Sequence, residues 1–228
     1  SLNPTMKIGN QIAETLKVHR GLKQASALKE AIRLLEQMKI PEASHRAGQY
    51  PFEFSGGMLQ RAMIALSLAC KPSLLIADEP TTALDVTIQA QILELMRDLQ
   101  REEKMSIILI THDLGVVAHM ADSVAVMYAG QICEVGSVDE IFYESSHPYT
   151  IGLRSAMPQN IETNERKLMP IEGSPPDLFK PPVGCGYFAR CPHAMRLCED
   201  RPPPRFSLGT QHATRCWLRH PNAPRSPA

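Results

Sequence analysis

The stretch LLIADEPTTALD, residues 74–85, places two adjacent carboxylates, Asp78 and Glu79, at the end of a short apolar run. A run that is apolar at every position predicts a strand buried on both faces, as in parallel sheets. Neighbouring side chains at a strand end point to opposite sides, so the two acids cannot share one task. One can meet a hydrated magnesium ion, and the other can orient or deprotonate an attacking water. A bare Asp-Glu pair is usually a solvated strand end or helix cap, but the apolar run, Pro80 and TALD favour nucleotide hydrolysis.

A second strand end follows later in the chain. SIILIT, residues 106–111, predicts another buried strand, and residues 86–103 carry apolar side chains at helical spacing. Alternating strands and helices predict an α/β sheet, in which ligands bind beyond the carboxyl ends of the strands. His112 follows the second strand directly, where an imidazole could donate to a transferring phosphoryl group. A lone histidine is more often structural, and only its place at the strand end makes it a candidate.

A third motif, FSGGM at residues 54–58, precedes an apolar stripe of helical spacing. Ser55 is a good helix N-cap. Gly56 and Gly57 have no side chains to keep an anion away from the exposed N–H groups and the positive end of the helix dipole. The alternative is a plain turn from a loop into a helix.

The remaining patterns predict two further helices and a hairpin. The helices are expected at residues 6–20 and 25–39, with Pro41 ending the second. The hairpin is expected over residues 123–136, with its turn at Ala129-Gly130.

The overall composition describes a globular chain. Hydrophobic residues make up 43% of the 228 residues and charged residues 21%. The 24 basic and 24 acidic residues cancel, so net charge does not indicate a nucleic-acid partner. The longest apolar stretches fall short of the ~20 residues of a membrane-spanning helix, and no stretch resembles a signal peptide. We therefore expect a soluble, cytosolic chain that could dock on a membrane component.

The C-terminal part differs in composition. Thirteen of the 19 prolines follow Met157, and four of the six cysteines follow Gly184. This shift predicts a main domain, a proline-rich connector and a small cysteine-rich domain.

Taken in order, SGG, LLIADEPTTALD and ILITHD resemble the ATP-binding subunits of ABC transporters, over the whole chain. The resemblance implies an ABC-type ATPase fold, with a P-loop-like parallel sheet and a helical subdomain. It implies that FSGGM is the signature motif, in which Ser55, Gly56 and Gly57 contact nucleotide. Phe54 and Met58 depart from the usual LSGGQ pattern.

The same resemblance assigns the strand-end residues. Asp78 corresponds to the aspartate that coordinates magnesium, Glu79 to the catalytic glutamate and His112 to the switch histidine. Asp85 falls in the D-loop and is expected at the ATP site. The implied domains are a helical subdomain at 1–70, half of a RecA-like core at 71–155, and a connector with a cysteine-rich domain at 156–228.

VMYAG, SHPYT and the cysteine-rich tail are similar to the peptide and nickel importer branch, nearest to its oligopeptide permeases. This implies a subunit that hydrolyses ATP to energise oligopeptide import, peripheral on the cytoplasmic face of the inner membrane. The implied partners are a second homologous ATPase, two transmembrane permease subunits and an extracytoplasmic peptide-binding protein, without nucleic acid. Dipeptide or nickel importers, a soluble ABC ATPase and a nonhydrolytic metal-binding fragment are the alternatives.

The sequence contains no G-x-x-x-x-G-K-[ST] phosphate-binding loop. We interpret the chain as beginning partway through an ABC ATPase; the alternative is a natural subunit that lost its own ATP site. The 228-residue chain alone is expected to hydrolyse ATP poorly or not at all.

The four tail cysteines have the spacing C-x5-C-x6-C-x17-C; they are Cys185, Cys191, Cys198 and Cys216. A reducing cytosol argues against disulfides in the cell, which leaves a metal site, unligated thiols or stray bridges formed after lysis. Zinc ribbons usually use C-x2-C pairs, absent here, and the wider spacing fits an iron–sulfur cluster at least as well. The resemblance implies a [4Fe–4S] cluster, with Zn²⁺ as the alternative and His193 and His212 as spare ligands. Cys70 and Cys133 are expected to be core residues.

Overall fold

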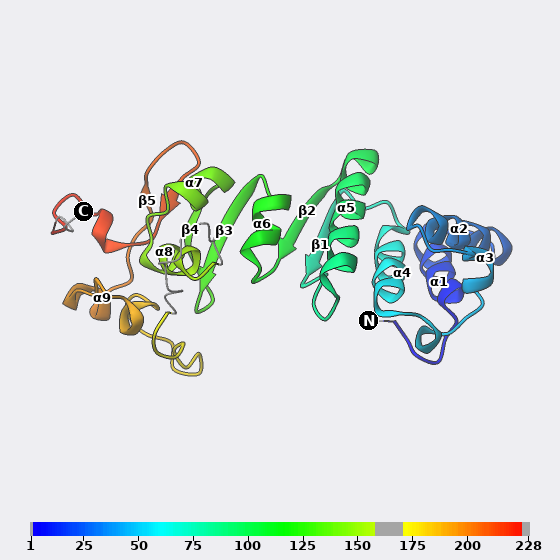
Figure 1. Ribbon diagram of the computed structural model, residues 1–228, viewed down its shortest axis with the longest axis horizontal. Coiled ribbons are helices and arrows are strands. Elements are labelled where there is room, and N and C mark those ends of the chain that lie inside the picture. The colour runs from blue at the N-terminus through cyan, green and yellow to red at the C-terminus, as the bar shows by residue number, and fades with distance from the viewer. Residues whose placement is uncertain (1, 158–170, 225–228) are drawn as a thin grey trace. The chain divides into compact units, whose positions relative to one another are not determined.

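The computed structural model describes residues 2–157 and 171–224 (Figure 1). The chain divides into two compact units, Ser1–His112 and Asp113–Ala228. The three-part division expected from the sequence has its boundaries elsewhere, and it stays a prediction.

The first unit begins with a helical part. Its helices are α1 (Ile8–Arg20), α2 (Gln24–Gln37), α3 (Ala43–Arg46) and α4 (Gly56–Leu68), with a 3₁₀ turn at Pro51–Glu53. Residues at helical spacing on α1 and α2, among them Ile12, Leu16 and Leu35, are fully buried, as an amphipathic stripe requires. The expected helices at 6–20 and 25–39 are confirmed to within two residues at each end. Helix α2 ends before Pro41 is reached, and Lys39 then adopts a left-handed conformation with φ 56°.

A strand–helix–strand element completes the first unit. Strands β1 (Leu74–Asp78) and β2 (Ser106–Ile110) pair in parallel, and α5 (Val86–Glu103) connects them. The register sets Asp78 opposite Ile110, so both strands end at the same edge. The apolar stripe of α5 is buried, as predicted from residues 86–103.

The two strands are not buried on both faces, contrary to the sequence expectation. Leu75 and Ala77 are buried, whereas Leu74, Ile76, Ile108 and Ile110 are exposed. Alternate side chains of a strand point to opposite faces. In the described residues only one face of this sheet is therefore packed, and the apolar side chains of the other face meet solvent.

The second unit is built on the predicted hairpin. Strands β3 (Ser123–Tyr128) and β4 (Gln131–Ser137) pair antiparallel, and the turn falls at Ala129 and Gly130, as expected. Both turn residues have positive φ, 49° and 75°, as a two-residue hairpin turn of type I′ requires.

Strands from the tail extend this hairpin into a four-stranded sheet. The order is β3-β4-β6-β5, with β5 at Phe206–Ser207 and β6 at Ala213–Thr214. The helices of this unit are α6 (Leu114–Met120), α7 (Val138–Tyr143), α8 (Pro148–Ser155) and α9 (Arg196–Asp200), with 3₁₀ turns at Phe188–Arg190 and Trp217–Arg219. The cysteine-rich segment thus lies in the same compact unit as the hairpin.

A buried carboxylate joins three segments of the second unit. The Glu134 side chain on β4 accepts hydrogen bonds from the backbone N–H groups of Ser146 (2.7 Å) and His147 (3.0 Å) at the start of α8. Its Oε1 lies 2.8 Å from Nε2 of His212, which directly precedes β6. The hairpin, the SHPYT segment and the tail therefore share one polar centre.

Within the described residues, no helix combines the length and the apolar character needed to cross a membrane.

Candidate active site

The parallel pairing of β1 and β2 brings the predicted acids and histidine to one edge. The ladder continues one residue past β1, because the backbone N–H of Glu79 donates to the carbonyl of Ile110 at 2.9 Å. Asp78 is the last residue of β1 and its side chain is exposed. His112 follows two residues after β2. The structure therefore places Asp78, Glu79 and His112 where the strand ends predict them.

The carboxylate of Glu79 has a hydrogen-bond partner on each oxygen. Nδ1 of His112 lies 2.7 Å from Oε1, and the hydroxyl of Thr82 donates to Oε2 at 2.6 Å. The hydrogen bond from Thr82, and after it the one with His112, lowers the pKa of Glu79 below its ordinary value. Glu79 is consequently held in the ionised form, which can accept a proton. Sequence reasoning found Glu79 and His112 but missed Thr82.

The FSGGM motif opens α4, as predicted. The hydroxyl of Ser55 accepts a hydrogen bond from the backbone N–H of Met58 at 3.4 Å, which is the expected N-cap. The free N–H groups of the first turn belong to the glycines, so this helix end has the features of an anion site.

The two glycines also have a packing role that sequence reasoning missed. A Cβ atom on Gly57 would lie 2.7 Å from Cγ2 of Ile88, and one on Gly56 would lie 3.4 Å from Cδ2 of Leu84. Helix α4 therefore begins against the TALD loop and the first turn of α5. Only the fold, not the motif, could indicate this contact.

Asp85 is the N-cap of α5. Its Oδ1 accepts a hydrogen bond from the backbone N–H of Ile88 at 2.9 Å. The carboxylate thus fixes where the TALD loop ends and α5 begins. The predicted place of Asp85 in the ATP site stays a prediction.

The four tail cysteines converge on one small pocket, which His193 also lines. The backbone N–H of Cys185 donates to the carbonyl of Cys198 at 2.7 Å, and a side chain at Gly184 would collide with the carbonyls of Cys198 and Glu199. Burial raises the pKa of Cys191 to about 11 and that of Cys216 to about 12. The thiols of Cys191 and Cys216 are therefore protonated at neutral pH.

That the four cysteines line one pocket does not by itself mean that they can bind a metal ion together. In the part of the chain that the structure describes, no three histidine, cysteine, aspartate or glutamate side chains are grouped so that they could hold a metal ion. His212, one of the two spare ligands, is taken up by Glu134. The remaining cysteines divide: Cys133 is buried as expected, but Cys70 is exposed, so its assignment to the core was wrong. Cys70 lies just after the end of α4, where the helix no longer covers it.

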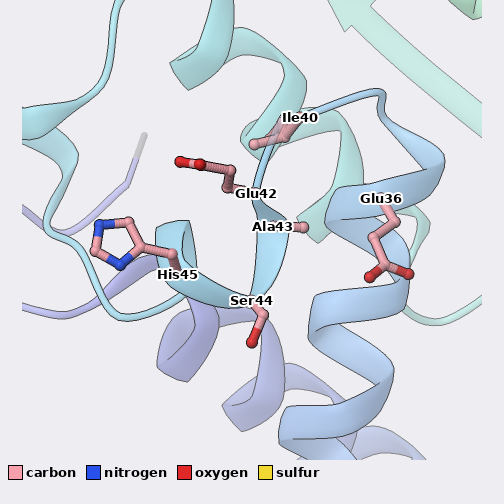
Figure 2. A pocket seen from close by; sticks show the side chains of 6 residues that line it. All are labelled: Glu36, Ile40, Glu42, Ala43, Ser44 and His45. Carbon is pink, nitrogen blue, oxygen red and sulfur yellow. The ribbon is translucent and has the colours of Figure 1, made fainter.

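A broad, open hollow lies in the helical part of the first unit (Figure 2). The six residues lining it are Glu36, Ile40, Glu42, Ala43, Ser44 and His45. None of the predicted site residues lies there, and two of its three charged or titratable side chains are acidic, which disfavours phosphate. We assign the chemistry to the strand ends rather than to this hollow.

Comparison with known proteins places these features in a family. Residues 1–82 match the family model of ABC transporters, and residues 133–198 match that of the C-terminal region of oligopeptide/dipeptide transporters. The oligopeptide transport ATP-binding protein OppD of Bacillus subtilis is 56% identical over 225 residues, which are 99% of this chain and 63% of that protein. OppD of Haemophilus influenzae is 51% identical over 219 residues, which are 96% of this chain and 67% of that protein.

The chain belongs to the ATP-binding subunits of oligopeptide and dipeptide ABC transporters. The ABC-type ATPase fold is supported by a solved structure, the dimeric post-hydrolysis ATP-binding cassette MJ0796 bound to ADP and phosphate. It has a TM-score of 0.53 and 26% identity, covering 60% of this chain and 59% of that one. The chain spans 63% and 67% of the lengths of these two relatives, which is about two thirds.

Proposed function

We propose that this chain is part of an ATP-hydrolysing subunit that powers the import of oligopeptides across a membrane. The observation that carries the proposal is the pair of Glu79 and His112 at the ends of two adjacent parallel strands, 2.7 Å apart. The names of the relatives, which are oligopeptide transport ATP-binding proteins, support the choice of cargo.

In this proposal each residue at the strand ends has one task. Glu79, ionised, orients the attacking water and accepts its proton. His112 donates to the γ-phosphoryl group, where charge develops. Asp78 is exposed at the end of β1 and would hold magnesium, which needs only one or two protein carboxylates and neutralises phosphate charge.

The residues at the start of α4 bind nucleotide from the other side. Ser55, Gly56 and Gly57 offer the N-terminal N–H groups of a 13-residue helix to the phosphates of an ATP held by a partner subunit. Asp85, the N-cap of α5 at the end of the TALD loop, lies near the bound ATP in this proposal. The 228 residues contain no phosphate-binding lysine loop, so this polypeptide by itself is expected to hydrolyse little ATP.

The partners proposed are a second homologous ATPase subunit, two transmembrane permease subunits and, indirectly, a peptide-binding protein outside the membrane. The chain would then lie peripherally on the cytoplasmic face of the inner membrane. Import of dipeptides is the nearest alternative, since dipeptide transporters share the same C-terminal family model.

The test compares Glu79→Gln with Glu94→Gln in a transporter assembled with an ATP-hydrolysing subunit that contains these residues together with a phosphate-binding loop. Glu94 is an exposed residue of α5, so its substitution makes the same chemical change away from the site. Loss of a general base is expected to lower kcat for ATP by about a hundredfold or more and to stop uptake of a labelled oligopeptide. Undiminished hydrolysis by Glu79→Gln would contradict the proposal. If the wild-type transporter takes up a labelled dipeptide and no labelled oligopeptide, dipeptides are the cargo.

We propose a second function for the tail, a metal site formed by Cys185, Cys191, Cys198 and Cys216. Supporting it is their convergence on one pocket. A [4Fe–4S] cluster is favoured and Zn²⁺ is the alternative; either group would cross-link a short segment that has little core of its own. Because the buried thiols must lose their protons to bind metal, affinity is expected to fall as the pH is lowered.

Metal analysis of the chain purified without oxygen tests this second function. About four irons and four acid-labile sulfides per chain support the cluster, and one zinc without sulfide supports the alternative. Cys198→Ser should lower the metal content, whereas Cys70→Ser, at an exposed position, should not. A chain that binds neither metal would refute the site.

A further inference from the structure

We propose that Thr82 is a positioning residue for Glu79: its hydroxyl fixes the orientation in which the carboxylate meets the attacking water. The inference rests on the proposed function of Glu79 and adds a third member to the pair of Glu79 and His112.

The contacts of the Glu79 carboxylate carry the proposal. The hydroxyl of Thr82 donates to Oε2 at 2.6 Å, and Nδ1 of His112 lies 2.7 Å from Oε1. Both distances are those of short, charge-assisted hydrogen bonds. A carboxylate held at one oxygen only can pivot about that contact, whereas one held at both oxygens has a single orientation.

The loop fixes Thr82 in the place where it can act. The backbone N–H of Thr82 donates to the carbonyl of Glu79 at 3.2 Å, and that of Leu84 donates to the carbonyl of Thr81 at 3.2 Å. Glu79 and Ala83 both have left-handed backbones, with φ 48° and 64°. Residues other than glycine keep this conformation only where their surroundings determine it.

Both ends of the loop are anchored as well. The N–H of Glu79 is bonded to the carbonyl of Ile110 on β2, and Asp85 caps α5. The hydroxyl three residues after Glu79 is thus directed at the carboxylate by a turn that is tied down on both sides. The contact between Thr82 and Glu79 is therefore set by the backbone conformation of an anchored loop.

The chemical consequence concerns the rate of the step and not the binding of ATP. A general base acts only when its lone pair points at the proton it removes, and a small misplacement is costly. Without the hydroxyl, the carboxylate would keep the His112 contact and lose its fixed plane. We expect kcat to fall by about 10- to 100-fold, with KM for ATP nearly unchanged.

The experiment uses Thr82→Val, which removes the hydroxyl at constant shape, and Thr82→Ser, which keeps it. Thr87→Val, on the exposed first turn of α5, is the matched control. In the assembled transporter, Thr82→Val should lower kcat without changing KM, Thr82→Ser should restore it, and Thr87→Val should have no effect. A kcat for Thr82→Val within twofold of the wild type would overturn the inference.

A second measurement does not depend on hydrolysis. The ¹³Cδ resonance of Glu79 in the 228-residue chain, assigned by its loss in Glu79→Gln, is recorded at one neutral pH. It should move in Thr82→Val and return in Thr82→Ser; an unmoved resonance in Thr82→Val would also overturn the inference. Failure of the proposed function is distinct, because it appears as undiminished hydrolysis by Glu79→Gln whatever the resonance does.

Discussion

The two units of the chain each contain a glutamate bonded to a histidine, at almost the same distance and in opposite surroundings. Glu79 and His112 are 2.7 Å apart, with side chains 38% and 82% exposed. Glu134 and His212 are 2.8 Å apart, with side chains 0% and 5% exposed. The exposed pair can meet a ligand and lies at strand ends where ligands bind, whereas the buried pair can only hold protein segments together. Distance alone would not have separated a candidate site from a structural tie; burial does.

Removal of the buried glutamate should have the largest effect on stability. Glu134→Ala leaves two backbone N–H groups and an imidazole buried without their acceptor, and should cost about 3–5 kcal/mol. Glu79→Ala should leave the unfolding transition in place. Chemical denaturation followed by circular dichroism measures both. An equal loss of stability in the two variants would abolish the distinction drawn between the pairs.

The second prediction concerns the pH dependence of stability, which should depend on the buried residue His147. Burial lowers the pKa of His147, at the start of α8, from 6.5 to about 4. Between these pH values the unfolded chain binds a proton at His147 that the folded chain does not, so the contribution of His147 to stability is constant above about pH 6.5 and falls as the pH drops towards 4. The full effect is on the order of 3 kcal/mol.

His147→Asn isolates this effect. Asparagine can still accept the N–H of Tyr149, which His147 accepts at 3.0 Å through Nδ1, but it does not titrate in this range. The stability difference between wild type and variant should therefore change between pH 6.5 and 4 and be flat above. Parallel curves across the whole range would show that the pKa of His147 is the same in the folded and the unfolded chain.

The stability of the first unit should depend on side-chain volume at the start of α4, whereas that of the second unit depends on its buried charged and titratable groups. Gly57→Ala gains about 1 kcal/mol of helix propensity but forces a Cβ to 2.7 Å from Ile88. Overpacking costs about 1–3 kcal/mol, so we expect a net loss of about 1 kcal/mol. Combining it with Ile88→Ala, which removes the clashing methyl group, should give a smaller loss than the sum of the two single variants. Gly56→Ala, with ordinary contact distance to Leu84, is the milder control.

The local signals in the sequence were sufficient for most elements and for the strand-end site. Apolar periodicity predicted the helices, and the strand pattern of residues 123–136 around Ala129-Gly130 predicted the hairpin. Because parallel strands end at one edge, Glu79 and His112 could be expected together although 33 residues separate them.

What sequence reasoning missed depends on contacts that no local pattern encodes. Glu134 meets His212 across 78 residues, through strands that pair only once the tail has folded back. The Thr82 hydroxyl and the fit of Gly57 against Ile88 follow from a loop conformation with two left-handed residues. The exposed face of β1 and β2 was predicted to be buried, because apolar composition alone does not indicate which faces of a sheet are covered.

The pairing of β6 with β4 has a consequence for solubility. Strand β4 is hydrogen-bonded to β3 on one side and to β6 on the other, at Glu134 and Val135. A chain shortened before residue 206 would leave β4 as a bare edge, next to a carboxylate that has lost its imidazole. Bare edges are templates for pairing with other chains. The last strands of the tail therefore cover the edge of β4 at Glu134 and Val135, independently of any metal that the cysteines bind.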